Sequence, residues 1–194
     1  RGAKHGGPNV RHWHRLNATR DFVQSKDLTT TVAINEFEKA GFDSVFDKTR
    51  VNIVLDHFVP NKDIKSAQQS KKCREFADKY DILNFYDVGT MGIEHALLPE
   101  KGIVTAGDCI IGADSHTCTY GRLCSSATGL GSTDVAPCMA PGTLWIKVPP
   151  TIREEFEGKM PKWLRGTDLR RRLIGSSRLD GALNQPRAFG RAHR

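Results

Sequence analysis

The chain has 194 residues, of which 38% are hydrophobic and 26% charged, and its formal net charge is +7. These values are typical of one globular domain. Because the sequence contains no run of about 18 apolar residues, we expect no membrane span. The positive charge lies at the two ends of the chain, whereas residues 27–160 are acidic overall. A nucleic-acid binder using the basic ends is one reading, but no aromatic interleaving or nucleic-acid motif supports it, so we do not expect this partner.

The first ordered element that the sequence predicts is a helix from about Thr29, which Gly41 ends. Residues 1–26 show little periodicity and are expected to be irregular and basic. Residues 51–55 are expected to form a buried strand that runs into Asp56-His57. Asn61 is expected to cap the next helix, whose apolar stripe is formed by Cys73, Phe76, Ala77 and Tyr80.

The second half of the chain continues the alternation of strands and helices. We expect strands at residues 84–88, 103–105 and 109–111, a turn and helix around His95, and a helix that begins at Ser132. Such alternation favours a three-layer α/β/α fold with a largely parallel sheet. Residues 163–194, with the arginine run 170–172, are expected to be a poorly ordered basic tail.

Five cysteines are present, with irregular spacing and no C-x-x-C pair: Cys73, Cys109, Cys118, Cys124 and Cys138. This spacing predicts neither a zinc ribbon nor a cluster-binding pair within this chain. Mostly buried free thiols in a reducing compartment are the simplest interpretation, and we therefore expect a cytoplasmic protein.

The candidate functional residues follow predicted strands. Parallel sheets place their chemistry at the carboxyl ends of the strands. Asp56-His57 follow one such strand and Asp114-Ser115-His116-Thr117 follow another, while His95 lies in a turn between them, with Glu94 expected to be a solvated neighbour. A carboxylate that binds one imidazole nitrogen fixes the tautomer and favours the protonated ring. The pattern therefore predicts a proton donor or a site for a metal-held hydroxide.

Alternatives remain open for each of these residues. Asp56 can cap a turn while His57 is satisfied in the core, and the segment 114–117 can be a structural turn. A mononuclear metal hydrolase that uses His57, His95 and His116 is the competing enzyme class.

Four longer segments resemble a known family. These segments are Val32–Phe37, Asp56–Ile64, Met91–Glu100 and Gly112–Gly121. Together they resemble the large subunits of the 3-isopropylmalate dehydratases, in the aconitase superfamily, with the homoaconitase and 2,3-dimethylmalate dehydratase branches as close relatives. The match is dense over residues 27–162, so we expect an aconitase-like domain there, flanked by the basic segments 1–26 and 163–194.

The resemblance implies a hydro-lyase that removes water from a hydroxy dicarboxylic acid and adds it back at the neighbouring carbon, in leucine biosynthesis. In this family a 4Fe-4S cluster acts as Lewis acid on the departing hydroxyl. By position, His57 matches the donor of a proton to that hydroxyl, with Asp56 beside it. His95 matches the partner of Asp114. His116 and Asp114 match residues that bind the iron-held water, and Ser115 matches a contact to a substrate carboxylate.

The resemblance also implies what this chain lacks. In the family, three cysteines that hold the cluster lie later in a longer chain, and the base is a serine on the small, swivelling subunit. We therefore expect an amino-terminal portion of a large subunit that holds no metal and is inactive alone. A non-catalytic remnant of the same fold is the alternative.

Overall fold

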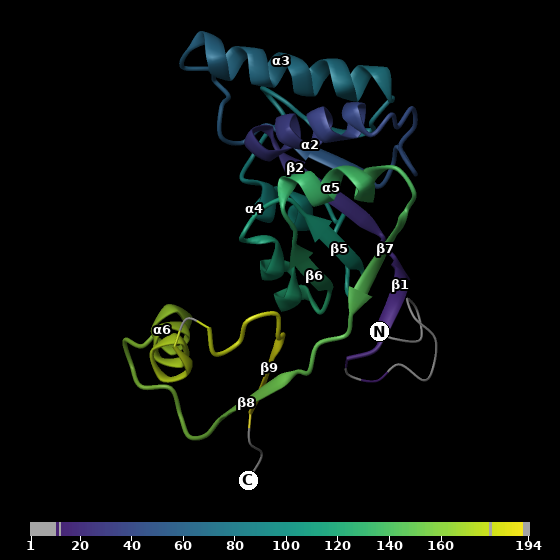
Figure 1. The fold of residues 1–194 in the computed structure, drawn as a ribbon. Coiled ribbons are helices and arrows are strands. Elements are labelled where there is room, and N and C mark those ends of the chain that lie inside the picture. Colours follow the sequence, from purple (N-terminus) through teal and green to yellow (C-terminus); the bar gives the residue numbers. More distant parts are fainter. Residues whose placement is uncertain (1–10, 12, 179, 192–194) are drawn as a thin grey trace. The chain divides into compact units, whose positions relative to one another are not determined.

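The computed structural model describes residues 11, 13–178 and 180–191 (Figure 1). Residues 1–10 and 12, for which the sequence predicts irregular structure, lie outside the described residues, as do 179 and 192–194 of the predicted tail. The described residues form two compact units, one of residues 17–145 and one of residues 146–191 with the described part of 9–16. No described helix combines the length and the apolar character that a membrane crossing needs.

The first unit is built on a five-stranded sheet. Its strands are β2 (Phe22–Lys26), β3 (Val51–Val54), β4 (Asn84–Tyr86), β5 (Cys109–Gly112) and β6 (Ser126–Gly129), and they lie in the order β4-β3-β2-β5-β6. Every ladder between them is parallel. The predicted parallel sheet is therefore confirmed, and β2 is its central strand.

Helices cover both faces of this sheet. The helices α2 (Asp27–Lys39), α3 (Ile64–Lys79) and α5 (Ser132–Met139) pack on one face, where a buried cluster includes Phe37, Ile53, Phe76, Ile111 and Val135. The helix α4 (Glu94–Glu100) and the 3-10 helix η1 (Thr117–Leu123) pack on the other face, around Val54, Leu98, Ile110 and Tyr120. Neighbouring strand residues point to opposite faces, so the three-layer prediction is confirmed.

The prediction of irregular structure for residues 1–26 was wrong for residues 15–26. Strand β1 (Arg15–Thr19) pairs with β7 (Thr143–Lys147), and β2 pairs with both β3 and β5. The sequence of β2 is FVQSK, which lacks the continuous apolar run typical of a central parallel strand. Its polar residues are nevertheless buried: Gln24 is 0% and Ser25 1% exposed.

Two smaller predictions were also wrong. Residues 103–105 form a loop, because Asp108 accepts the N–H of Thr105 at 2.6 Å and its hydroxyl at 2.8 Å. The cap of α3 is Asp63, whose carboxylate accepts the N–H of Ser66 at 2.8 Å. Asn61 instead donates to the carbonyl of Phe58 at 2.7 Å, which closes the preceding turn.

The second unit contains little buried apolar surface. Strand β8 (Ile152–Phe156) pairs in parallel with β9 (Arg187–Arg191), and α6 (Gly166–Ser177) lies between them in sequence. The Phe156 and Phe189 rings stack at 6.0 Å, and Arg187 forms an ion pair with Glu154 at 2.9 Å. No residue of α6 is buried, and the arginine run 170–172 is exposed.

Candidate active site

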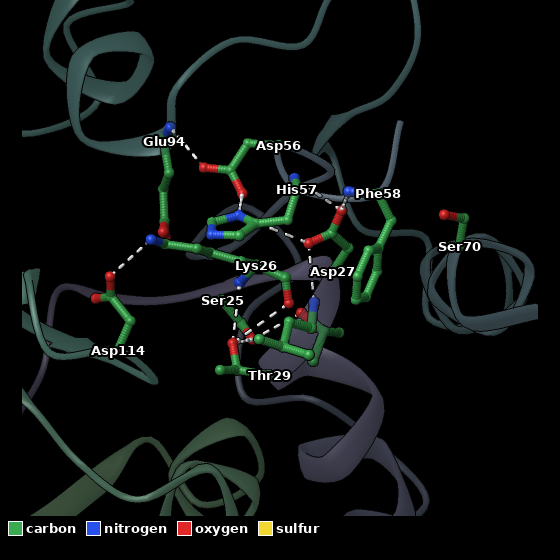
Figure 2. A network of polar contacts seen from close by, with 12 residues as sticks. Ser25, Lys26, Asp27, Thr29, Asp56, His57, Phe58, Ser70, Glu94 and Asp114 are labelled. Atoms are coloured by element: carbon green, nitrogen blue, oxygen red, sulfur yellow. Dashed lines mark hydrogen bonds and ion pairs between the residues drawn. The ribbon is translucent and has the colours of Figure 1, made fainter. Parts of the chain in front are cut away.

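The predicted residues gather at the carboxyl edge of the sheet, around the end of β2. The chain passes from β2 to β3 and β4 on one side and then crosses to β5 on the other side of β2. Such a reversal of strand order opens a crevice beyond the strand ends, where ligands of α/β proteins bind. Asp56 follows β3, Asp114 follows β5, and Lys26 ends β2 between them, as Figure 2 shows.

Asp114 is held by three polar side chains of this site. It accepts the hydroxyl of Thr117 at 2.6 Å, lies 2.8 Å from Nε2 of His95 and forms an ion pair with Nζ of Lys26 at 2.8 Å. Burial alone raises the pKa of Asp114, but the hydrogen bonds from Lys26, Thr117 and His95 outweigh it and hold the pKa well below its usual range. Asp114 is therefore an anion at neutral pH.

His95 lies between Asp114 and Tyr120. Its Nδ1 is 2.9 Å from the hydroxyl of Tyr120, and only 14% of its side chain is exposed. Burial raises the pKa of Tyr120, which keeps its hydroxyl protonated. A neutral His95 that donates from Nε2 to Asp114 can accept the Tyr120 hydroxyl at Nδ1, so both ring nitrogens are satisfied.

Asp56 and His57 form the second predicted pair. Nδ1 of His57 lies 2.5 Å from one oxygen of Asp56, and the other Asp56 oxygen accepts the backbone N–H of Glu94 at 3.1 Å. The Asp56 side chain is 5% exposed, whereas that of His57 is 47% exposed. The alternative of a His satisfied in the core is therefore wrong for His57, because its ring reaches solvent while its acid partner is fixed.

His116 and Ser115 lie at the periphery. The side chain of His116 is 77% exposed, with Nδ1 3.8 Å from Asp114, and the Ser115 hydroxyl is 3.3 Å from the same nitrogen. The His95 and His116 rings are 6.2 Å apart between centroids. The structure thus brings His95, His116 and Asp114 together on one side of Lys26, and Asp56 and His57 together on the other.

Asp27 is a structural member of the site that the sequence reading did not single out. It is 0% exposed and accepts the backbone N–H groups of Leu28, His57 and Phe58 at 2.9, 3.0 and 2.6 Å. These bonds tie the first turn of α2 to the loop that carries His57. The sequence did contain a signal for Asp27. An acid that stands directly before a helical pattern is typical of the first turn of a helix.

The prediction that Glu94 is a solvated neighbour was wrong. Glu94 is 1% exposed, and its Oε1 atom is buried without a hydrogen-bond partner. Burial, followed by the charge of Asp114, raises the pKa of Glu94 well above its ordinary value, with Lys26 opposing. Acidic residues at the start of a helix are normally exposed. Here Glu94, the first residue of α4, is buried and its side chain points toward Lys26 (Figure 2).

Among the described residues, two sets of side chains place metal-ligand atoms within 4.8 Å of one another: Asp27 with Asp56 and His57, and Glu94 with His95 and Asp114. In the first set the carboxylates accept backbone N–H groups, and in the second Asp114 is already paired with Lys26. Neither set contains a cysteine, and the five thiols are free, with Cys73, Cys109 and Cys138 buried. Burial raises the pKa of Cys73 to about 12, so this thiol is protonated.

A sequence profile of the Aconitase family (aconitate hydratase) matches residues 8–189. The 3-isopropylmalate dehydratase large subunit of Caldicellulosiruptor saccharolyticus is 60% identical over 166 residues, which cover 86% of this chain and 39% of the relative. The corresponding protein of Heliobacterium modesticaldum is 55% identical over 188 residues, or 96% and 45% of the two chains. The corresponding protein of Clostridioides difficile is 54% identical over 188 residues, which cover 96% of this chain and 44% of the relative.

The chain thus spans less than half the length of these curated relatives. The matched residues include the five-stranded sheet and all the side chains that meet at its carboxyl edge. From the extent of this match, the chain belongs to the aconitase family.

Proposed function

We propose that this chain is part of the large subunit of a 3-isopropylmalate dehydratase, a hydro-lyase that converts 2-isopropylmalate into 3-isopropylmalate in leucine biosynthesis. The observation that carries the proposal is the exposed His57 ring, whose Nδ1 atom is held by a buried Asp56 beside the Lys26–Asp114–His95 network. The relatives described above carry the same name, which favours this acid over the homoaconitase and 2,3-dimethylmalate branches.

His57 is the proposed acid of the reaction. Removal of a hydroxyl group as water needs a proton at its oxygen, and general acid catalysis of this kind contributes about 10²- to 10⁴-fold. Asp56 fixes Nδ1 of His57 at 2.5 Å, which leaves Nε2 as the nitrogen that can reach a ligand. The half-exposed ring lets the proton be replaced from solvent after each turnover.

Asp114 and His116 are the proposed binders of the oxygen that leaves and returns, and His95 is the proposed partner of Asp114. Asp114 is a fixed anion and His116 is exposed at 3.8 Å from it, so the two can bind a water or hydroxyl between them. His95 and Thr117 orient Asp114 from the protein side. Ser115, beside His116, is the proposed contact to a substrate carboxylate.

The complete enzyme would need parts from outside this chain. The family implies a 4Fe-4S cluster, which supplies a Lewis acid to the leaving hydroxyl when bound. The five cysteines of this chain do not fit its ligand set, because none belongs to a clustered group of ligand atoms. We therefore propose that the cluster ligands lie in another part of the large subunit, that a small subunit supplies the base, and that the enzyme acts in the cytoplasm.

The test is reconstitution of the whole enzyme. A large subunit that contains this chain is co-expressed with a dehydratase small subunit, loaded with iron and sulfide under argon, and given 2-isopropylmalate. We expect the ultraviolet absorbance of the unsaturated diacid to appear, and we expect His57→Gln to lower kcat by about 10²-fold or more. The surface variant Glu75→Gln serves as control. A loaded enzyme that dehydrates homocitrate or 2,3-dimethylmalate but not 2-isopropylmalate would refute the proposed substrate.

A further inference from the structure

Lys26 occupies an unusual position for a lysine. It ends the central strand of the sheet, 9% of the residue is exposed, and it is surrounded by acids on three other segments of the chain. Figure 2 shows its side chain extending between Asp114 and Glu94, with Asp56 nearby. A buried ammonium is costly unless it is paired, so its partners determine what it does.

The partner of Lys26 is Asp114. The two charged atoms lie 2.8 Å apart, and the side chains are 11% and 12% exposed. Burial by itself lowers the pKa of Lys26, but the hydrogen bond to Asp114 leads the effects that outweigh it, so the ammonium stays charged. The same Asp114 oxygen lies 2.8 Å from His95. Lys26 therefore fixes the oxygen that orients the imidazole.

The protonation state of Glu94 explains why the Lys26 ammonium pairs with Asp114. The carboxyl groups of Glu94 and Asp114 lie on either side of Lys26, so an ionised Glu94 would compete with Asp114 for the ammonium. Burial is the main effect that disfavours ionisation of Glu94, whose Oε1 atom has no hydrogen-bond partner, and the negative charges of Asp114, Asp56 and Asp27 add to it. When Glu94 is neutral, Lys26 and Asp114 form an ion pair without net charge.

We propose that Lys26 is a positioning residue of this site, the resident cation that holds Asp114 in place against His95 and offsets its charge so that a dicarboxylate can approach the acidic edge. The part that concerns the dicarboxylate rests on the proposed function, whereas the part that concerns Asp114 does not. Lys26 acts through Asp114, and no contact between Lys26 and a ligand is needed.

The decisive experiment measures the titration of Asp114 in the full 194-residue chain by carbon-13 NMR of side-chain carboxyls, with Asp114→Asn to assign the signal. The compared variants are Lys26→Met, which keeps length and removes charge, and Lys26→Arg, which restores charge. We expect the Asp114 midpoint to lie below that of an ordinary aspartate in the native chain. Lys26→Met should raise the midpoint by about one pH unit or more, a tenfold change in proton affinity, and Lys26→Arg should return most of the shift.

Two results would overturn the proposal. One is a native Asp114 midpoint at the ordinary aspartate value, which needs no variant and holds even if Lys26→Met does not fold. The other is a folded Lys26→Met chain, verified by amide dispersion, with an unshifted midpoint. A purely structural role for Lys26 would change stability without moving this titration.

The reconstituted enzyme tests the second half of the inference. There, Lys26→Met should raise KM for 2-isopropylmalate about tenfold or more, with a smaller effect on kcat, because a dianion then meets an uncompensated Asp114. An unchanged KM together with a shifted Asp114 titration would refute only the proposal that Lys26 helps a dicarboxylate to approach the site. A native enzyme without turnover of this acid would refute the proposed function and leave the NMR result standing.

Discussion

The turn after β5 and the first turn of α4 each bring a carboxyl group into the same site, and the two groups adopt opposite protonation states. Asp114 receives a hydroxyl, an imidazole and an ammonium, and its pKa is lowered. Glu94 receives no hydrogen bond at Oε1, and its pKa is raised. Burial raises the pKa of both groups, and it acts more strongly on Glu94, which is 1% exposed, than on Asp114, whose side chain is 12% exposed. The pKa of Asp114 is lowered because hydrogen bonds and one cation outweigh burial there.

The two carboxyl groups are therefore not interchangeable. The Thr117 hydroxyl and the His95 imidazole also donate to Asp114, so Lys26 pairs with Asp114 and not with Glu94. Glu94 then remains a neutral acid because it is buried and its Oε1 atom accepts no hydrogen bond. A substitution of either Asp114 or Glu94 should therefore alter the protonation state of the other.

The largest expected effect is that of Asp114→Ala. This variant leaves Lys26 buried without its partner and removes the acceptor of His95, and breaking a buried ion pair from one side costs about 3 to 5 kcal/mol. Urea denaturation of the 194-residue chain at neutral pH measures the loss. The matched control is Glu75→Ala, which removes an acid from the exposed pair with Lys71 and should cost less than about 1 kcal/mol. Equal losses in the two variants would contradict the account.

The next largest effect is expected for Glu94→Gln, whose change in stability should have opposite signs in the native chain and in Asp114→Ala. In the native chain, Glu94→Gln removes an acid that folding forces to stay protonated, so we expect a gain in stability near pH 7. In the Asp114→Ala background, Lys26 lacks its ion-pair partner and Glu94, which lies beside it, can ionise in place of Asp114, so the same change should destabilise the chain by about 1 to 3 kcal/mol. A double-mutant cycle by urea denaturation measures this coupling. Additive effects would show that the two carboxyl groups do not share the cation.

The sequence predicted the positions of Asp56 and Asp114 because each follows an apolar strand, VNIV in β3 and CIIG in β5. The carboxyl ends of parallel strands share one edge, so their proximity followed from the strand assignment. Strand β2 was missed because Gln24, Ser25 and Lys26 are polar although buried. For Ser25 and Lys26 that departure marks the site itself, since Ser25 accepts the Thr30 hydroxyl and Lys26 pairs with Asp114.

The burial of Glu94 could not be predicted for a different reason. An acid in the first turn of a helix normally faces solvent and the helix dipole, and nothing local distinguishes Glu94 from such a residue. Its environment is set by Lys26, Asp56 and Asp114, which lie far from it in sequence and reach it only through the sheet order. The pairing of Lys26 with Asp114 depends on the same long-range arrangement, namely β5 lying next to β2.

The pH dependence of stability should have opposite signs for the two acids. The raised pKa of Glu94 means that the unfolded chain loses this proton near pH 4.3 while the folded chain keeps it, so the native chain loses stability relative to Glu94→Gln as pH rises above about 4.3, by at most about 1.4 kcal/mol per pH unit. The lowered pKa of Asp114 means that its contribution is complete above about pH 3.9 and is lost as pH falls below that value. Thermal unfolding at about pH 3 to 8 measures both. A native-to-Gln difference that is constant with pH would show that Glu94 is ionised in the folded chain.

The smallest expected effect on stability is that of His57→Gln. The ring is 47% exposed, and its closest polar partner among the described side chains is Asp56, with Asp27 at 4.0 Å. Asp56 also accepts the backbone N–H of Glu94. Because Asp56 keeps that second bond, the loss of the imidazole should change the free energy of unfolding by less than about 1 kcal/mol. The same variant should lower turnover strongly in the reconstituted enzyme, so stability and activity separate at this position. A large loss of stability by urea denaturation would place His57 with Asp27 among the residues that hold the loop, and would remove the basis for its role as the acid.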